Sequence, residues 1–209
     1  MLKLKNVDLI IIDCINPEQA VKTLDICSEN IEFGNSIIFT HENIETNNHE
    51  IVKITNLDSI EKYSDFCLKI NNYIDNDYVL IVQNDGFILN PELWSDVFLN
   101  YDYIGAPWMQ TSEIRQKVGN GGFSLRSKKF LNFSSFYETT NGIPEDNFLC
   151  INKYQDAIDF GIVYAKTKIA NQFAFELPNM CCEIFNPSKH FGFHGKHNLE
   201  IVSKYIKNR

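Results

Sequence analysis

The sequence predicts an α/β protein with one mixed, mostly parallel sheet flanked by helices. Two apolar runs, Val7–Ile12 and Tyr78–Val82, have the length and continuity of strands that are buried on both faces. Segments with apolar residues at helical spacing alternate with such runs, and this alternation is typical of parallel sheets. Because the chain contains no internal repeat and no long linker, we expect a single domain over residues 1–209.

Each predicted element of the first half has its own local signal. Asp13 ends the first strand, and Asn16 followed by Pro17 marks the start of a helix. We expect Asp58 to cap a second helix, whose apolar positions keep a period of about 3.6 residues. The predicted elements are a strand Val7–Ile12, a helix Glu18–Asn30, a strand Ser36–Thr40, a loop Glu42–Glu50, a strand Ile51–Ile54, the helix after Asp58 with apolar positions from Ile60 to Ile74, and a strand Tyr78–Val82.

Shorter elements and more aromatic residues follow the strand Tyr78–Val82. The polar stretch Gln110–Lys117 contains no core-forming run, and we expect it to be a mobile loop. An aromatic-rich tail, Phe185–His194, precedes the end of the chain. The predicted elements are a helix Pro91–Leu99, a strand Tyr103–Ala106, a strand Gly121–Leu125, a helix Glu145–Ile151, a strand Gly161–Ala165, a helix Thr167–Phe173 and an amphipathic C-terminal helix Lys196–Arg209.

Composition and charge exclude several classes of protein. Hydrophobic residues make up 44% and charged residues 22% of the chain, which is typical of a globular and not of a disordered protein. Lys and Arg number 19 against 27 for Asp and Glu, a net charge of −8, so we expect no nucleic-acid partner. No apolar run approaches the roughly eighteen residues of a membrane span, and Leu9–Ile12 is too short for a signal peptide. We therefore expect a cytoplasmic protein without a transmembrane segment.

The six cysteines show neither a Cys-x-x-Cys pair nor the density of a disulfide scaffold, so we interpret them as reduced thiols. The adjacent pair Cys181 and Cys182 leaves open a vicinal disulfide or half of a soft-metal site. The second cysteine pair that would complete such a metal site is missing.

The first candidate site follows the strand Tyr78–Val82. Gln83, Asn84, Asp85 and Gly86 come directly after it, at the edge where open α/β sheets bind ligands. A carboxylate held there can supply one ligand to Mg²⁺ or Mn²⁺, while diphosphate oxygens and water supply the others. The alternative is that these four residues form only a turn.

The second candidate is the glycine-rich segment Val118–Ser127. Gly121 and Gly122 lie in it, and glycines beside a strand let a ligand approach the backbone closely. The order of strand, G-x-G-x-x-G and helix that marks a dinucleotide site is absent, and so is a Walker lysine. A plain β-bulge is the alternative.

Two further groups of residues carry chemistry. Glu145 and Asp146 open a short predicted helix, whose N-terminal dipole stabilises ionised carboxylates. One of them could deprotonate an acceptor hydroxyl, or both could simply cap the helix. His190, His194 and His197 lie near the C-terminus, but their spacing is not that of a zinc site built by one segment. One of these histidines could complete the cation site of the first candidate.

Five motifs follow one another along the chain: Val82–Gly86, Tyr101–Trp108, Gly119–Ser127, Glu145–Asp146 and Phe191–Gly195. Taken together and in this order, they resemble a family of bacterial, viral and fungal proteins that is catalogued as a domain of unknown function. The resemblance covers about Val7 to Gly195 and implies a GT-A-like (Rossmann-like) glycosyltransferase fold. More distantly, the order of the motifs is similar to that of Fringe-like and β-1,3-galactosyltransferases.

The resemblance assigns roles to most of the candidate residues. Gln83 and Asp85 stand at the first and last positions of a D-x-D motif, whose last residue is the usual metal ligand. Gln83 departs from that motif, because an amide is a poor ligand for a hard cation. The Fringe-like layout makes Asp146 the catalytic base, with Glu145 capping or orienting beside it, and makes His194 a further metal ligand.

The resemblance also implies where substrates bind. Residues 1–90 would form the nucleotide-binding half, residues 91–195 the acceptor and catalytic half, and residues 196–209 the C-terminal helix. Trp108 could stack on a pyranose ring of the acceptor or could anchor the core. The implied donor-binding residues are Asp13, which falls where GT-A proteins contact the nucleobase or ribose, and Gln83, Asn84, Asp85, Gly121 and Gly122.

The leading hypothesis is a metal-dependent glycosyltransferase that moves a sugar from a nucleotide sugar, expected to be UDP-linked, to a hydroxyl of a glycan acceptor in surface glycan synthesis. Mn²⁺ or Mg²⁺ would stabilise the departing diphosphate, and a base on the opposite face of the sugar would give inversion. The alternative is a catalytically silent nucleotide-sugar or glycan-binding module, because the first Asp of D-x-D is missing. A nucleotidyltransferase is a third hypothesis, disfavoured because no glycine-rich, basic phosphate loop follows the first strand.

Overall fold

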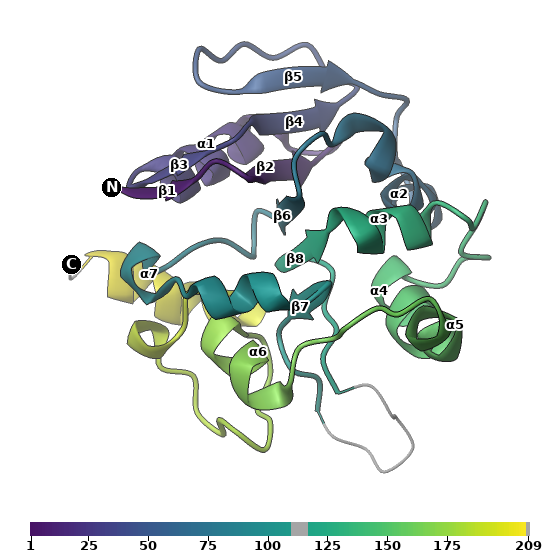
Figure 1. Ribbon diagram of the computed structural model, residues 1–209. Helices are drawn as coiled ribbons and strands as arrows, with labels where there is room; N and C mark the ends of the chain where they lie inside the picture. The colour runs from purple at the N-terminus through teal and green to yellow at the C-terminus, as the bar shows by residue number, and fades with distance from the viewer. Residues whose placement is uncertain (110–116, 208–209) are drawn as a thin grey trace.

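The computed structural model describes residues 1–109 and 117–207 of the chain (Figure 1). The expected loop Gln110–Lys117 lies, apart from Lys117, outside the described residues. The strands are β1 (Leu2–Leu4), β2 (Val7–Ile12), β3 (Ile31–Phe33), β4 (Ser36–Thr40), β5 (Glu50–Lys53), β6 (Tyr78–Val82), β7 (Tyr103–Gly105), β8 (Ser124–Ser127), β9 (Ala174–Phe175) and β10 (Gly192–Phe193).

Helices occupy much of the chain between these strands. The α-helices are α1 (Pro17–Ser28), α2 (Ile60–Leu68), α3 (Lys128–Ser134), α4 (Glu145–Asn147), α5 (Tyr154–Asp159), α6 (Thr167–Phe173) and α7 (Leu199–Lys207). Short 3₁₀ turns cover Ile70–Tyr73, Pro91–Leu93, Asp96–Asn100, Pro187–Lys189 and Lys196–Asn198, and one π-helical turn covers Phe148–Asn152.

The main sheet has six strands in the order β5-β4-β2-β6-β8-β7. Strands β5, β4, β2 and β6 are parallel to one another, whereas β8 runs antiparallel to both β6 and β7. The predicted α/β class with a mixed, mostly parallel sheet is therefore confirmed. After β2, the chain adds β4 and then β5 on one side of β2. It then forms β6, which pairs with the other side of β2. The carboxyl ends of β2 and β6 thus flank the point where the strand order reverses, which is where open α/β sheets form their ligand crevice.

Helices cover both faces of this sheet, because the central strands are apolar on both sides. Leu9 and Ile11 of β2 face one core together with the buried residues of α1, α6 and α7, while Ile10 and Ile12 face a second core with α2 and α3. Alternate residues of a strand point to opposite faces, so an unbroken aliphatic run serves both cores. A third core beneath Tyr103 joins α3 to the segment from α4 to α5.

The C-terminal tail folds back over the sheet through an aromatic cluster. Phe191 is fully buried, and its ring lies against the rings of Trp94, Phe98, Phe123 and Phe173 at centroid distances of 5.3–6.3 Å. The next residues form β10, which pairs in parallel with β9 and places Phe193 opposite Phe175. The packing of this cluster therefore positions the residues after Phe193 at the carboxyl edge of the sheet.

The structure corrects several predicted boundaries. Pro91–Leu99 is not one helix but two 3₁₀ turns, because Trp94 and Ser95 take extended backbone angles between them. The predicted strand Gly121–Leu125 begins only at Ser124, and Gly161–Ala165 contributes a single bridge at Tyr164 to Tyr103.

The helix expected to be capped by Asp58 is capped by Ser59 instead. The Ser59 hydroxyl accepts a hydrogen bond from the Lys62 amide, while the Asp58 carboxylate pairs with the Lys62 ammonium. The sequence analysis also missed β1, β3, α3 and α5, which are short elements with few apolar positions to set a period.

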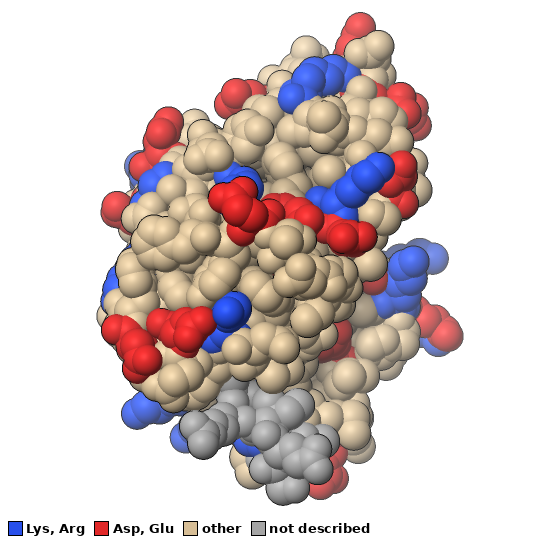
Figure 2. Space-filling model, turned by 90° about the vertical axis from the view of Figure 1, so that its right-hand side faces the viewer, with Lys and Arg blue, Asp and Glu red and all other residues tan. Residues whose placement is uncertain are grey.

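On the face shown in Figure 2, acidic groups lie beside Lys and Arg groups, and uncharged surface separates these clusters. None of the helices in residues 1–109 and 117–207 is long and apolar enough to cross a bilayer. All six cysteines are free thiols, as predicted.

We predict that Phe191→Ala destabilises the protein by about 3–5 kcal/mol, because it empties the centre of the aromatic cluster. Urea unfolding measures this loss. Phe136→Ala is the control, because Phe136 is 67% exposed and should cost less than about 1 kcal/mol. Equal effects of the two variants would show that the cluster does not hold the tail.

Candidate functional site

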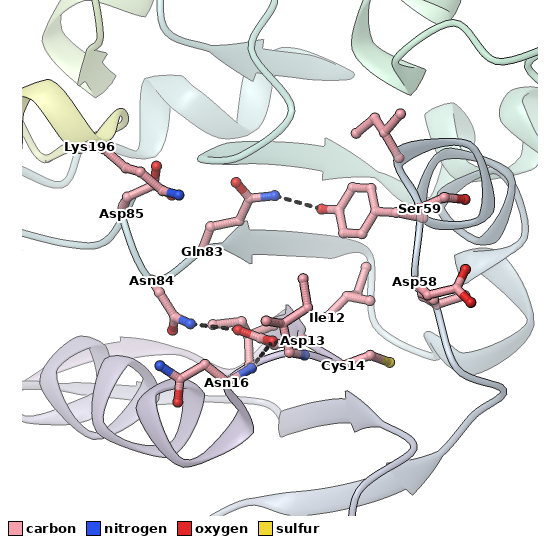
Figure 3. Close-up of a pocket in the computed structure, with 15 residues that line it drawn as sticks. Ile12, Asp13, Cys14, Asn16, Asp58, Ser59, Gln83, Asn84, Asp85 and Lys196 are labelled. Carbon is pink, nitrogen blue, oxygen red and sulfur yellow. Dashed lines mark hydrogen bonds between the residues drawn. The ribbon is translucent and has the colours of Figure 1, made fainter.

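A cavity of about 700 Å³ opens at the carboxyl ends of β2 and β6 (Figure 3). The end of β2 and the residues after it form its floor, the start of α2 forms one wall, and the turn after β6 forms the other. It is lined by Ile11, Ile12, Asp13, Cys14, Ile15, Asn16, Leu57, Asp58, Ser59, Ile60, Tyr63, Gln83, Asn84, Asp85 and Lys196. Four of the predicted donor-binding residues, Asp13, Gln83, Asn84 and Asp85, therefore share one cavity.

Asp13 and Asn84 join the two strand ends. One Asp13 oxygen accepts hydrogen bonds from the Ile15 and Asn16 amides at 2.7 Å, and the other accepts from the Asn84 side-chain nitrogen at 2.5 Å. The Asn84 oxygen in turn accepts from the Thr23 hydroxyl of α1 at 3.1 Å. Because both Asp13 oxygens already accept bonds from the protein, the first role of Asp13 is to fix the shape of the cavity floor.

A tight turn presents Asp85 at the edge of the cavity. Gln83 and Gly86 exchange two backbone hydrogen bonds, which leaves Asn84 and Asp85 at the tip of the turn. The tail holds this turn, because the Gly195 amide donates to the Asp85 carbonyl at 2.8 Å. The structure thereby brings Asp85 and His194 together, with 3.7 Å between Asp85 Oδ1 and His194 Nε2.

His194 sits among polar groups from three other parts of the chain. Its Nε2 lies 3.1 Å from Gln83 Oε1, and its Nδ1 lies 2.8 Å from Asn120 Nδ2 and 3.0 Å from Glu176 Oε1. Burial opposes the charged form of His194, but the hydrogen bond with Glu176 and the nearby carboxylates outweigh it and raise its pKa above the ordinary value. The ring therefore lies in an environment that favours a positive charge.

The glycine-rich segment is packed against this histidine. A Cβ on Gly122 would lie 2.1 Å from His194 Nε2 and 2.6 Å from Gln83 Oε1, and a Cβ on Gly121 would lie 2.0 Å from Glu145 Oε1. Asn120 precedes them with φ 65°, a left-handed conformation that Asn tolerates. Gly121 and Gly122 are thus required for close packing of the side chains behind the cavity, and neither lines the cavity itself.

The two acids of α4 have different surroundings. Asp146 accepts a hydrogen bond from the Gly121 amide at 3.0 Å, which ties α4 to the glycine-rich segment. Glu145 is buried and pairs with Arg126 at 2.8 Å, with both side chains at most 5% exposed. Burial raises the pKa of Glu145, and the Arg126 guanidinium offsets part of this effect. Only Asp146 of the two is partly accessible and free of an ion pair among the described residues.

Trp108 lies away from the cavity. Its ring rests directly on Gly119, where a Cβ would come within 1.9 Å of Trp108 Cζ2, and it packs against the third core. The side chain is nonetheless partly exposed.

The other two tail histidines have backbone partners. His190 is buried and donates from Nδ1 to the Asn171 carbonyl at 2.5 Å, and burial lowers its pKa. His197 is exposed, and its Nε2 lies 2.9 Å from the Glu176 carbonyl. Of the three histidines, His194 alone contacts the turn after β6 in the part of the chain that the structure describes.

Sequence reasoning missed three residues of the site. Tyr63 looked like a core position, but its hydroxyl accepts a hydrogen bond from Gln83 at 2.9 Å and its side chain lines the cavity. Lys196, two residues after His194, also lines the cavity (Figure 3). Because Lys196 directly follows the last family motif, sequence reasoning could have found it. Glu176 follows the short strand β9 and carried no recognisable pattern.

Comparison with known proteins places the chain in a family. A family model described as "Protein of unknown function (DUF5672)" matches residues 46–194, which is most of the chain. The chain belongs to this family. A search of curated proteins gave no significant match.

Two solved structures are similar to this family member in fold. One is an active-site mutant of LgtC, with 14% identity, a TM-score of 0.52, and coverage of 90% of this chain and 87% of that one. The other is the inositol-1-phosphate CTP transferase from T. maritima, with 10% identity, a TM-score of 0.50, and coverage of 94% and 95%. At these identities the likeness establishes the GT-A-like fold class, in agreement with the sequence analysis.

We predict that Glu145→Ala destabilises the protein by about 3–5 kcal/mol, because it leaves the buried Arg126 charge without its partner. Among the described residues, Arg126 Nη1 already has no hydrogen-bond partner, and the other partners of the guanidinium, Ser124 Oγ and the Gly121 carbonyl, carry no charge. Glu138→Ala is the control, because Glu138 pairs with Lys69 but is 88% exposed. Its loss should cost about 1 kcal/mol or less in chemical denaturation. A Glu145→Ala cost as small as that of the control would mean that the pair does not stabilise the site.

We also predict a pH effect from His190. Its folded-state pKa lies below the unfolded value of about 6.5, so the unfolded chain binds the proton more tightly. The contribution of His190 to the free energy of unfolding therefore rises with pH through the window below about 6.5 and is constant above it. Denaturation at several pH values should show this rise in the wild type and in His197→Gln, and a smaller rise in His190→Gln. Parallel curves for all three proteins would contradict the assignment.

Proposed function

We propose that the protein is a metal-dependent glycosyltransferase that uses a nucleotide sugar, UDP-linked, and transfers the sugar to a hydroxyl of a glycan acceptor with inversion. The observation that carries the proposal is the meeting of Asp85 and His194 at the edge of the cavity between β2 and β6. The fold shared with LgtC and with a CTP transferase supports a nucleotide-using transferase. The proposal goes beyond that likeness and rests on the residues of this chain.

The residues present fit a divalent cation that is held together with a diphosphate. Ligands about 2.1 Å from an octahedral cation lie about 3.0 Å apart when they are adjacent. The separation of 3.7 Å between His194 Nε2 and Asp85 Oδ1 is within about 1 Å of this spacing. No three His, Cys, Asp or Glu side chains come together as a cation site in residues 1–109 and 117–207. A donor set with one carboxylate fits a cation whose remaining ligands are diphosphate oxygens and water.

The rest of the cavity fits a nucleoside diphosphate. Lys196 lines the same cavity as Asp85, where its ammonium can pair with a phosphate oxygen (Figure 3). The apolar side chains of Ile12, Leu57 and Ile60 offer a surface for a nucleobase. Asp13 and Asn84 can position the ribose between the two strand ends. These assignments keep Asp13, Gln83, Asn84 and Asp85 as donor-binding residues.

The acceptor side depends on Asp146. When bound, Mn²⁺ or Mg²⁺ acts as a Lewis acid toward the departing diphosphate. Asp146 takes the proton of the attacking acceptor hydroxyl, and attack from the face opposite the diphosphate inverts the anomeric centre. Glu145 positions this base through its pair with Arg126, because Arg126 also reaches the Gly121 carbonyl. The partly exposed face of Trp108 is the proposed platform for an acceptor sugar.

Donor hydrolysis tests the proposal directly. A panel of nucleotide sugars is incubated with the protein and Mn²⁺, and release of the nucleoside diphosphate is followed. Release from a UDP-sugar that stops on chelation is the expected result. Tight UDP-sugar binding without turnover of any donor, with or without acceptor sugars, would favour the silent module that the missing first Asp of D-x-D suggested. Transfer of a nucleotidyl group from CTP to a sugar phosphate would favour a nucleotidyltransferase.

We predict that Asp85→Asn lowers turnover by at least about 100-fold, because losing the charged cation ligand costs several kcal/mol in the transition state. The substitution keeps the volume and the turn propensity of the residue, so the fold should persist. Asp75→Asn, on an exposed residue after the 3₁₀ turn Ile70–Tyr73, serves as the matched control. Turnover of Asp85→Asn within about threefold of the wild type would remove Asp85 from the cation site.

We predict that Asp146→Asn lowers kcat steeply while donor affinity stays nearly unchanged. This split is expected for a group that acts only in the transition state. Steady-state kinetics with a donor and its acceptor measure kcat, and calorimetry with the nucleoside diphosphate measures donor-site affinity. An equal loss in both would make Asp146 a binding residue instead of the base.

A further inference from the structure

The two ring nitrogens of His194 face different kinds of partner. On one side, Nε2 faces two oxygens, Gln83 Oε1 at 3.1 Å and Asp85 Oδ1 at 3.7 Å. On the other side, Nδ1 faces Asn120 Nδ2 at 2.8 Å and Glu176 Oε1 at 3.0 Å. An amide nitrogen can only donate a hydrogen bond and a carboxylate can only accept one. Asn120 and Glu176 therefore require opposite states of Nδ1.

The orientation of Asn120 is fixed by the backbone. Its Oδ1 accepts a hydrogen bond from the buried Phe123 amide at 3.1 Å, so its nitrogen must point to His194. When Nδ1 accepts from Asn120, the proton of the neutral ring sits on Nε2 and is donated to Gln83. In that state Nε2 has no lone pair to offer to a cation.

The position of Glu176 is fixed by strand pairing. In the parallel pair of β9 with β10, Phe175 lies opposite Phe193. Glu176 and His194 are the residues that directly follow these two strand ends. The His194 amide donates to the Phe175 carbonyl, and Asn198 Nδ2 donates to the Glu176 carbonyl, both at 2.9 Å. When Nδ1 donates to Glu176, the neutral ring carries its lone pair on Nε2, directed toward Gln83 and Asp85. This is the state in which a histidine can ligate a metal.

We propose that Glu176 is a positioning residue that selects the Nδ1-protonated tautomer of His194 and so makes Nε2 available as a cation ligand, while Asn120 holds the competing tautomer. The inference rests on the proposed function, because it assigns His194 to the cation of that site. It adds a two-state element to the site, in which the cation and Glu176 favour one tautomer and Asn120 with Gln83 favours the other. A metal-ligating histidine generally donates its second N–H to such a partner, whose loss weakens metal binding about 10- to 100-fold.

Two substitutions separate this role from a packing role. Glu176→Met removes the acceptor at nearly the same length, and the side chain is only 17% exposed, so an apolar group is tolerated there. Asn120→Asp replaces the donor by an acceptor of the same shape and keeps an oxygen for the Phe123 amide. If Glu176 acts through the tautomer, Asn120→Asp should rescue Glu176→Met. Glu183→Met, an exposed acid on the segment between β9 and β10, is the control.

The first measurement uses the cation-free protein without nucleotide. Long-range ¹H–¹⁵N correlations of ¹⁵N-histidine-labelled protein, at a pH where His194 is neutral, report which nitrogen carries the proton. We expect the Nδ1-protonated form in the wild type and in Glu183→Met, and the Nε2-protonated form in Glu176→Met. Asn120→Asp in the Glu176→Met background should restore the Nδ1-protonated form. The same tautomer in the wild type and in Glu176→Met would overturn the inference.

The second measurement is Mn²⁺ binding in the presence of UDP, followed by the electron paramagnetic resonance signal of free Mn²⁺. Glu176→Met should raise the half-saturating Mn²⁺ concentration at least about tenfold, and the double variant should recover most of that loss. Unchanged Mn²⁺ binding in Glu176→Met would overturn the inference. If the wild type itself binds no Mn²⁺ with UDP, the proposed function fails and the ligand role fails with it. The tautomer measurement then still decides whether Glu176 selects the state of His194.

Discussion

The site depends on the docking of residues 192–195 against the turn after β6. This contact joins parts of the chain that are about half its length apart, and it is possible because glycines leave room for it. A Cβ on Gly86 would lie 2.7 Å from His194 Cδ2, and a Cβ on Gly192 would lie 2.2 Å from the ring of Phe123. Gly122 is under the same constraint from His194. Without these three glycines the tail could not approach, and Asp85 would face the cavity without an imidazole beside it.

The charges around this contact explain why we propose a cation that is bound together with its nucleotide. Asp85 is the single carboxylate of the D-x-D position, because Gln83 replaces the first one. His194 is drawn toward its charged form by Glu176, Asp85 and Asp146, so a proton competes with the cation for the same ring. Lys196 adds a positive charge at the edge of the cavity. A diphosphate would supply the further anionic ligands that the D-x-D position, with Asp85 as its single carboxylate, does not provide.

The sequence predicted those parts of the fold that depend on one segment at a time. The strands β2, β4 and β6 and the helix α1 were readable because each is an apolar run or a periodic stretch with a clear end. Asp13 was expected at the donor site only through the family resemblance, and the structure puts it near Asp85 because β2 and β6 are neighbours in the sheet. The family motifs added His194, whose contact with the turn after β6 no local pattern indicated.

The parts that could not be predicted depend on packing between distant segments. Glu145 looked like a candidate for chemistry, but it forms a buried ion pair with Arg126, and no pattern in the glycine-rich segment indicated that pairing. Gly121 and Gly122 suggested space for a ligand, and the space is filled by Glu145 and His194. Glu176 acquires its place only through the pairing of β9 with β10, two strands too short to leave a signal in the sequence.

The most direct test of the account is a crystal structure of the protein soaked with UDP and Mn²⁺, with data collected at the manganese absorption edge. The account predicts one anomalous peak at bonding distance from both Asp85 Oδ1 and His194 Nε2, with the diphosphate of UDP as its other ligand and the nucleoside in the cavity between β2 and β6. UDP bound in that cavity with no manganese beside Asp85 and His194, or UDP bound elsewhere, would contradict it.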